Sequence, residues 1–178
     1  MPAVSGWLLA GVRTPFARAG GPFRHVPSYE LGRVAAAEAI ARAELDPARL
    51  DEVIFGHCGM PAEAANSSRI VALRAGVPER VPAFTVHRNC ASGMEAVASA
   101  LYRIAAGDAS LVLAGGMENM TQIPLQYSVE YARLLHQTHR DAAARAELET
   151  AVSLPPTSDA LDARYQAEAR DLLGKLGR

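Results

Sequence analysis

The sequence predicts an α/β fold, with a parallel-sheet βαβαβαβ core and helices on both faces, followed by a helical segment. Two observations predict this fold. Short apolar runs alternate with alanine-rich helical segments over the first two-thirds of the 178 residues. The composition, with 49% apolar and 21% charged residues, is typical of a globular protein rather than a disordered one.

The first two strands are separated by a helix with clear boundaries. A buried strand is expected over Val4 to Gly11, because this run is almost uniformly apolar. A helix is expected from about Tyr29 to Leu45, with Ser28 as its N-cap and Asp46-Pro47 as its stop signal. The second strand is expected over Glu52 to Gly56.

The same alternation continues for two further units. A helix over Asn66 to Ala75 leads to a strand over Ala83 to Val86. A second helix, Ser92 to Ala106, leads to a fourth strand over Leu111 to Ala114. Because parallel strands end at one edge of a sheet, we expect the loops that follow them to meet there and to form the site.

The character of the chain changes after about residue 122, where no further β-rich run appears. Helices are expected over Tyr127 to Ala151 and over Asp159 to Leu176, with Asp159 as a cap. The predicted domains are therefore 1–123, an α/β domain, and 124–178, a helical segment. An alternative interpretation of the helical segment is a solvated appendage, because its charged residues are those of ordinary exposed helix faces.

Several classes of function are disfavoured by composition. A net charge of −1 gives no reason to expect nucleic acid or an anionic membrane as a partner, and the apolar runs are too short to span a bilayer. Cys58 and Cys90 form neither a disulfide framework nor a metal-binding spacing, which fits a reducing cytoplasm. No glycine fingerprint supports a dinucleotide. We expect no metal and no tightly bound cofactor.

Cys90 is the most informative residue, because it lies where a strand turns directly into a helix. Unpaired backbone N–H groups and the positive end of the helix dipole meet at a helix N-terminus, and both stabilise a thiolate. The same N–H groups can bind the oxyanion formed when a thiolate attacks an acyl carbonyl. The alternative is a free cysteine packed as a small buried hydrophobic side chain.

Several motifs, in this order, resemble those of the thiolase family, the acyltransferases that make or cleave 3-oxoacyl-CoA. The most specific are Arg88 to Gly93, around the cysteine, and Ala114 to Thr121. Gly11 to Phe16, Leu50 to Gly56 and Asn66 to Arg69 support them. The fold expected from this resemblance is that of the N-terminal half of a thiolase.

The resemblance implies that Cys90 takes an acyl group from a coenzyme A thioester and passes it to CoA or to the enolate of acetyl-CoA. This is acyl-CoA chemistry of the kind used in fatty acid metabolism. Gly115-Gly116 then resembles a close-packing turn beneath the site, and Glu118 and Asn119 resemble structural residues. The family has no catalytic histidine at the position of His57, so a structural role is favoured for it.

The resemblance covers only part of a thiolase. The family's Gly-His-Pro, Asn-Glu-Ala and Cys-x-Gly segments do not occur in this sequence. We therefore expect the chain to be inactive alone and to act as a homo-oligomer or with a separately encoded C-terminal half. The alternative function is a non-catalytic or truncated thiolase-like subunit that acts as an interaction protein. A condensing enzyme of the same superfamily ranks last.

Overall fold

The computed structural model describes residues 6–61, 64–121, 124–153 and 160–176. The chain forms two compact units, Met1–Asn119 and Met120–Arg178. The first unit holds a parallel sheet and three α-helices, and the second holds three further helices. Each unit has its own buried apolar cluster, so each is described separately.

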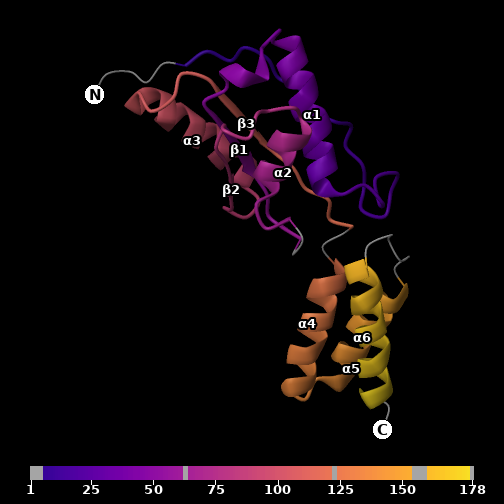
Figure 1. The fold of residues 1–178 in the computed structure, drawn as a ribbon. Helices are drawn as coiled ribbons and strands as arrows, with labels where there is room; N and C mark the ends of the chain where they lie inside the picture. The colour runs from indigo at the N-terminus through magenta and orange to yellow at the C-terminus, as the bar shows by residue number, and fades with distance from the viewer. Residues whose placement is uncertain (1–5, 62–63, 122–123, 154–159, 177–178) are drawn as a thin grey trace. The chain divides into compact units, whose positions relative to one another are not determined.

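A three-stranded parallel sheet forms the centre of the first unit (Figure 1). Its strands are β1 (Glu52–Gly56), β2 (Ala83–Val86) and β3 (Val112–Gly116), in the order β2-β1-β3. Both neighbours of β1 run parallel to it. The predicted limits of β1 and β2 are confirmed, whereas β3 extends through the two glycines that the sequence placed after the strand.

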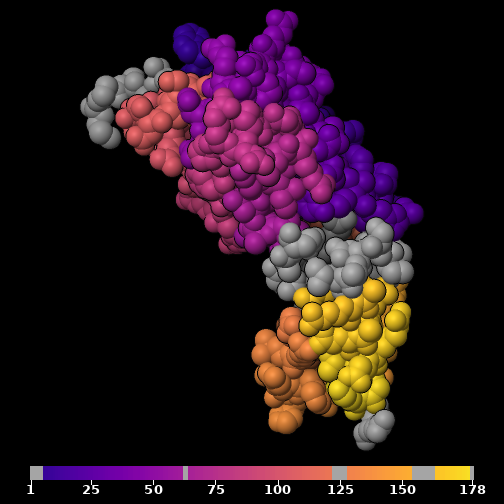
Figure 2. Space-filling view, in the orientation of Figure 1, coloured from indigo at the N-terminus to yellow at the C-terminus, as the bar shows by residue number. Residues whose placement is uncertain are grey.

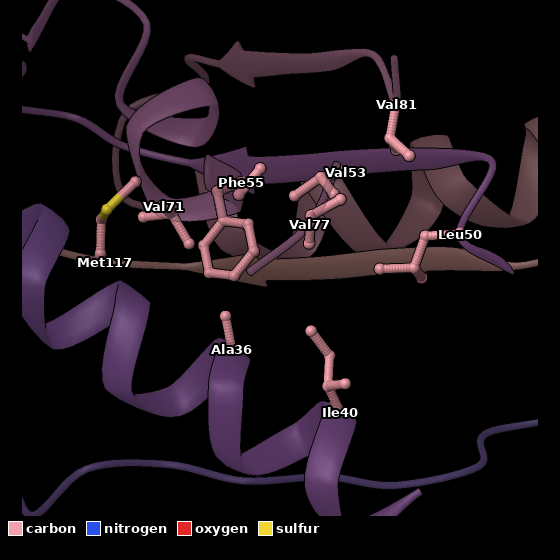
Figure 3. Packing of buried hydrophobic residues seen from close by; sticks show 10 residues of the cluster. Ala36, Ile40, Leu50, Val53, Phe55, Val71, Val77, Val81 and Met117 are labelled. Atoms are coloured by element: carbon pink, nitrogen blue, oxygen red, sulfur yellow. The ribbon is translucent and has the colours of Figure 1, made fainter. Parts of the chain in front are cut away.

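Helices cover both faces of this sheet, as the sequence predicted. Along β1, Val53 and Phe55 belong to the buried cluster shown in Figure 3, whereas Ile54 belongs to the opposite cluster. This alternation follows from the period of two along a strand. The cluster of Figure 3 includes residues of α1 (Ser28–Arg42) and α2 (Ser67–Arg74). The opposite cluster includes residues of α3 (Ser92–Ala106).

The ends of α1 differ from the prediction by a few residues. Pro27 is the N-cap, and Ser28 is already the first helical residue, so Ser28 is not the cap that the sequence suggested. At the other end Glu44 has φ 50°, and the N–H of Leu45 donates to the carbonyl of Ile40. This left-handed turn is a Schellman-type ending, which stops the helix before Leu45. The 3-10 turn η1 (Pro47–Arg49) follows it.

The strand predicted over Val4 to Gly11 is wrong for the described residues 6–11, which adopt no regular structure. Trp7 and Leu8 are 93% and 89% exposed. The run is apolar enough to be a strand, but in the described part of the sheet it has no neighbouring strand to bond its backbone. An extended segment gains little without such a neighbour. The described sheet therefore has three strands instead of four.

The second unit is a bundle of α4 (Pro124–Gln137), α5 (Asp141–Ser153) and α6 (Ala160–Leu176). α4 and α6 lie side by side on the face that Figure 2 shows. The single helix predicted over Tyr127 to Ala151 is wrong: His139 has φ 58°, and the chain reverses there into a helical hairpin. The hairpin lets α4 and α5 bury their apolar faces against each other. The predicted cap Asp159 lies outside the described residues.

No helix among the described residues is long and apolar enough to cross a membrane.

Candidate functional site

Cys90 lies in the loop between β2 and α3, and its side chain is exposed. The residue before it, Asn89, has φ 49°, so the chain turns sharply just ahead of the cysteine. Ala91 is the N-cap of α3, which begins at Ser92. The thiol therefore stands within one turn of a helix N-terminus and open to solvent, and it is not packed as a buried hydrophobic side chain.

Ser92 holds this loop in shape. Its hydroxyl accepts a hydrogen bond from the Arg88 N–H at 2.8 Å and donates one to the Asn89 carbonyl at 2.6 Å. Ser92 itself is buried. Through these two bonds Ser92, which follows Cys90, is joined to Arg88 and Asn89, which precede it. The loop is therefore closed around Cys90. The sequence alone does not indicate this role of the hydroxyl, because it depends on a turn that only the structure shows.

Three glycines bring the first turn of α3 directly onto the ends of two strands. A Cβ at Gly56 would lie 2.1 Å from the carbonyl carbon of Ser92, and a Cβ at Gly116 would lie 3.1 Å from the Cα of Gly93. The end of β1 and the end of β3 therefore contact α3 backbone to backbone. Gly116 was expected to pack closely here; Gly56 was not singled out, because nothing in its local pattern distinguishes it from a strand end.

The charges nearest the loop are paired with each other. Arg88 and Glu95 form an ion pair at 2.5 Å, with Arg88 largely exposed. Glu95 lies in the first turn of α3, where a carboxylate favours the helix dipole but opposes a nearby thiolate. The guanidinium of Arg88 offsets that opposition. His87, the residue before Arg88, is exposed.

Glu118 fastens the loop that follows β1. Its carboxylate accepts hydrogen bonds from the N–H of Cys58 at 3.0 Å and of Gly59 at 3.2 Å. Burial acts to raise the pKa of Glu118, but the contact with His57 and the two backbone N–H groups outweigh it and lower the pKa. This loop and the Cys90 loop follow neighbouring strands, so both lie at the same edge of the sheet.

His57 is fully buried, and its Nδ1 lies 2.8 Å from the hydroxyl of Ser67. Its Nε2 lies 3.4 Å from Glu118, a distance for an ion pair rather than for a good hydrogen bond. His57 is therefore enclosed in a polar network and cannot reach a substrate. Burial, followed by the charges of Glu118 and Cys90, raises the pKa of the Cys58 thiol.

Two further residues of the sequence motifs, Asn119 and Arg13, make hydrogen bonds to loop carbonyls. Asn119 donates from its amide nitrogen to the carbonyls of Phe23 and Val26, both at 2.8 Å. Arg13 donates to the adjacent carbonyl of Thr14 within an exposed segment. Within the described ranges, no group of three histidine, cysteine, aspartate or glutamate side chains could hold a metal ion.

The comparisons with known proteins agree with one another. The family described as thiolase, N-terminal domain, matches residues 7–168. A "Probable acetyl-CoA acyltransferase" of Staphylococcus aureus is 43% identical over 118 residues, which is 66% of this chain and 30% of that protein. Its counterpart in Staphylococcus epidermidis is 42% identical over the same length.

A solved structure shows the same likeness in three dimensions. The acetyl-CoA acetyltransferase of Bacillus anthracis superposes with a TM-score of 0.62 at 41% sequence identity. The match covers 64% of this chain and 29% of that one. The chain therefore spans about 30% of the length of the curated relatives it matches.

Proposed function

The chain belongs to the thiolase family, and from that membership we propose that it carries the acyl-accepting nucleophile of an acetyl-CoA acyltransferase, with Cys90 in that role. The relatives are described as acyltransferases of acetyl-CoA, so a coenzyme A thioester is the proposed acyl donor. The observation that carries the proposal is the exposed thiol within one turn of the N-terminus of α3.

In the proposed first step, the Cys90 thiolate attacks the thioester carbonyl. The C–S bond to coenzyme A breaks, CoA leaves as a thiolate, and an acyl-cysteine remains. The helix dipole stabilises the attacking thiolate, and the Cys90 N–H donates to the oxyanion. The contacts of Gly56 and Gly116 with α3 keep the loop fixed while charge moves from sulfur to oxygen.

The second step, transfer to CoA or to the enolate of acetyl-CoA, needs groups that move protons. The 178-residue sequence contains none of the family segments that supply them. We propose that a thiolase C-terminal half supplies these groups. In support, the outer face of α3 carries an exposed apolar stripe at helical spacing, namely Met94, Val97 and Leu101.

The proposal is tested by incubating the 178-residue chain with acetyl-CoA and measuring the mass of the intact protein. We expect one added acetyl group on Cys90, none in the Cys90→Ser variant, and an unchanged result in the Cys58→Ser variant. Acetylation that persists in Cys90→Ser would overturn the assignment of the nucleophile.

A turnover assay tests the need for the C-terminal half. The chain alone should not cleave acetoacetyl-CoA, and addition of a thiolase C-terminal half should restore cleavage. Cleavage by the purified chain at ordinary enzyme rates would contradict this part of the proposal.

A second candidate function is a non-catalytic subunit that keeps the fold and binds a partner through α3. The exposed stripe of Met94, Val97 and Leu101 favours it, because such a surface fits a protein partner whether or not the cysteine reacts. The acetylation experiment separates the two: an interaction protein leaves Cys90 unmodified by acetyl-CoA.

A further inference from the structure

One ring nitrogen of His57 has an environment that is unusual for a buried polar atom. The residue is fully buried, and its Nε2 is the one buried side-chain nitrogen or oxygen of the described residues that has no hydrogen-bond partner. That nitrogen lies 3.4 Å from Oε1 of Glu118. Buried polar groups without partners are rare, so this contact requires an explanation.

The positions of the hydrogens follow from the neighbours of the ring. The Ser67 hydroxyl donates to the Ala64 carbonyl at 2.8 Å, which uses its only hydrogen. At 2.8 Å from His57 Nδ1 it can then only accept, so Nδ1 carries a hydrogen. On the other side, Glu118 is bound by two N–H groups and is a carboxylate. A bare Nε2 lone pair facing it would be repelled, so Nε2 also carries a hydrogen.

We propose that the buried ring of His57 and the partly exposed carboxylate of Glu118 form an imidazolium–carboxylate pair that fixes the Cys58–Gly59 loop beside Cys90, which makes both of them positioning residues of the candidate site. The description of that edge as a site rests on the proposed function; the ion pair itself does not. The charge on the ring holds the carboxylate in place, and the carboxylate holds the two N–H groups of the loop.

The surroundings favour a charged pair over two neutral groups. The Glu118 side chain is 30% exposed and accepts from two backbone N–H groups, and both conditions keep it ionised beside the buried ring. The other titratable groups at this edge are Cys58 and Cys90, the exposed His87, and the ion pair of Arg88 with Glu95; of these, Cys90 acts electrostatically on Cys58. From α2, Ser67 contributes a hydroxyl and no charge. No second cation of the described residues contacts Glu118, so His57 is the group that balances it.

Ring-nitrogen NMR of the intact chain tests the ion pair directly. At neutral pH, we expect both nitrogens of His57 to be protonated. Exposed His139 serves as the reference histidine in the same spectrum. A His57 ring with a single protonated nitrogen would overturn the proposal.

Two variants of His57 separate positioning from simple filling of space. The amide nitrogen of His57→Gln replaces Nε2 and keeps a donor for Glu118; that of His57→Asn replaces Nδ1 and keeps only the Ser67 contact. In a Cys90→Ser background, we expect Cys58 to be alkylated about tenfold faster in His57→Asn, because loss of the charged contact between Nε2 and Glu118 releases the loop. His57→Gln keeps the donor but not the charge, so its rate should lie between those of His57→Asn and the parent.

A third variant supplies a pH readout. Glu118→Gln removes the charge that helps to raise the pKa of Cys58, so its alkylation profile should move to lower pH. Circular dichroism confirms that each variant is folded. Equal Cys58 rates in His57→Asn and His57→Gln, or an unmoved profile in Glu118→Gln, would overturn the proposal. None of these measurements requires acyl transfer, so a failure of the proposed function would be recorded separately.

Discussion

Gly56 shows how a residue without a side chain can fix the position of the loop that carries Cys90. The end of β1 touches the first turn of α3, and any side chain at Gly56 would occupy the space of the Ser92 backbone. Backbone atoms cannot rotate away as a flexible side chain can. The position of the Cys90 loop therefore depends on the absence of a methyl group at a strand end.

The change Gly56→Ala should destabilise the fold and displace the start of α3. Its Cβ would lie 2.1 Å from Ser92, and overpacking of this kind costs about 3 kcal/mol. Urea unfolding measures the loss. The matched control is Gly174→Ala in α6, where a Cβ meets nothing within 4 Å and stability should rise by up to about 1 kcal/mol. Similar stabilities for the two variants would contradict the close contact.

Glu118 should make stability depend on pH in the acid range. Its pKa is lowered in the folded state from the usual 4.5, so the folded chain binds its proton less readily than the unfolded chain. The stabilisation is then present above pH 4.5 and is lost as pH falls through the folded-state value. In urea titrations, the stability advantage over Glu118→Gln should shrink below pH 4.5. A constant difference across that range would contradict the lowered pKa.

The residues of the site differ in how far the sequence could predict them. The placement of Cys90 follows from a strand run directly beside a helix run, which is local information. Ser92 and Gly56 could not be identified in this way, since their roles come from a turn geometry and a contact between distant segments. The Glu118 contact with Cys58 spans 60 residues, and no local pattern contains it.

At the scale of elements, Asn66 joins α2 to β2. Its Oδ1 accepts from the Arg69 N–H as the helix N-cap and also from the Thr85 hydroxyl, while its Nδ2 donates to the Ala83 carbonyl. The sequence placed Asn66 inside the helix as its first residue. In the structure it precedes the helix, which is where asparagine is most favourable.

Replacing Asn66 should separate these two roles. Asn66→Ala removes the cap and the link to β2, and we expect a loss of about 1–2 kcal/mol. Asn66→Ser keeps an oxygen that can cap the helix and loses the donor to Ala83, so its loss should be smaller. Thermal unfolding of the three proteins gives the order. A serine variant as unstable as the alanine variant would show that the cap contributes little.

The elements that the sequence predicted well are those whose ends carry a local signal in the sequence. β1, β2 and α3 have the predicted bounds, because each apolar run ends at a clear turn. The run over residues 6–11 has the composition of a strand, but a strand also needs a neighbour to bond with. The helix over 127–151 fails for a related reason: the break at His139 reflects packing between two helices.

At the scale of the whole molecule, the first unit buries one side of its sheet more completely than the other. The cluster with α1 and α2 contains ten buried residues, whereas the cluster with α3 contains three. α3 itself carries Met94 and Val97 on its surface, 73% and 52% exposed. Apolar patches of this kind mark interaction surfaces. We therefore expect the side of α3 away from the sheet to contact another protein molecule.

Replacing this surface should reduce self-association while leaving the fold intact. In the variant Met94→Gln with Val97→Gln, both new side chains favour a helix at least as well as most apolar ones and remove exposed apolar area. Sedimentation velocity over a range of concentrations should show association of the parent chain and less association of this variant. The control is Val34→Gln, an exposed position on α1. If the control reduces association as much as the α3 variant does, general surface hydrophobicity is the cause, and α3 is not the specific interface.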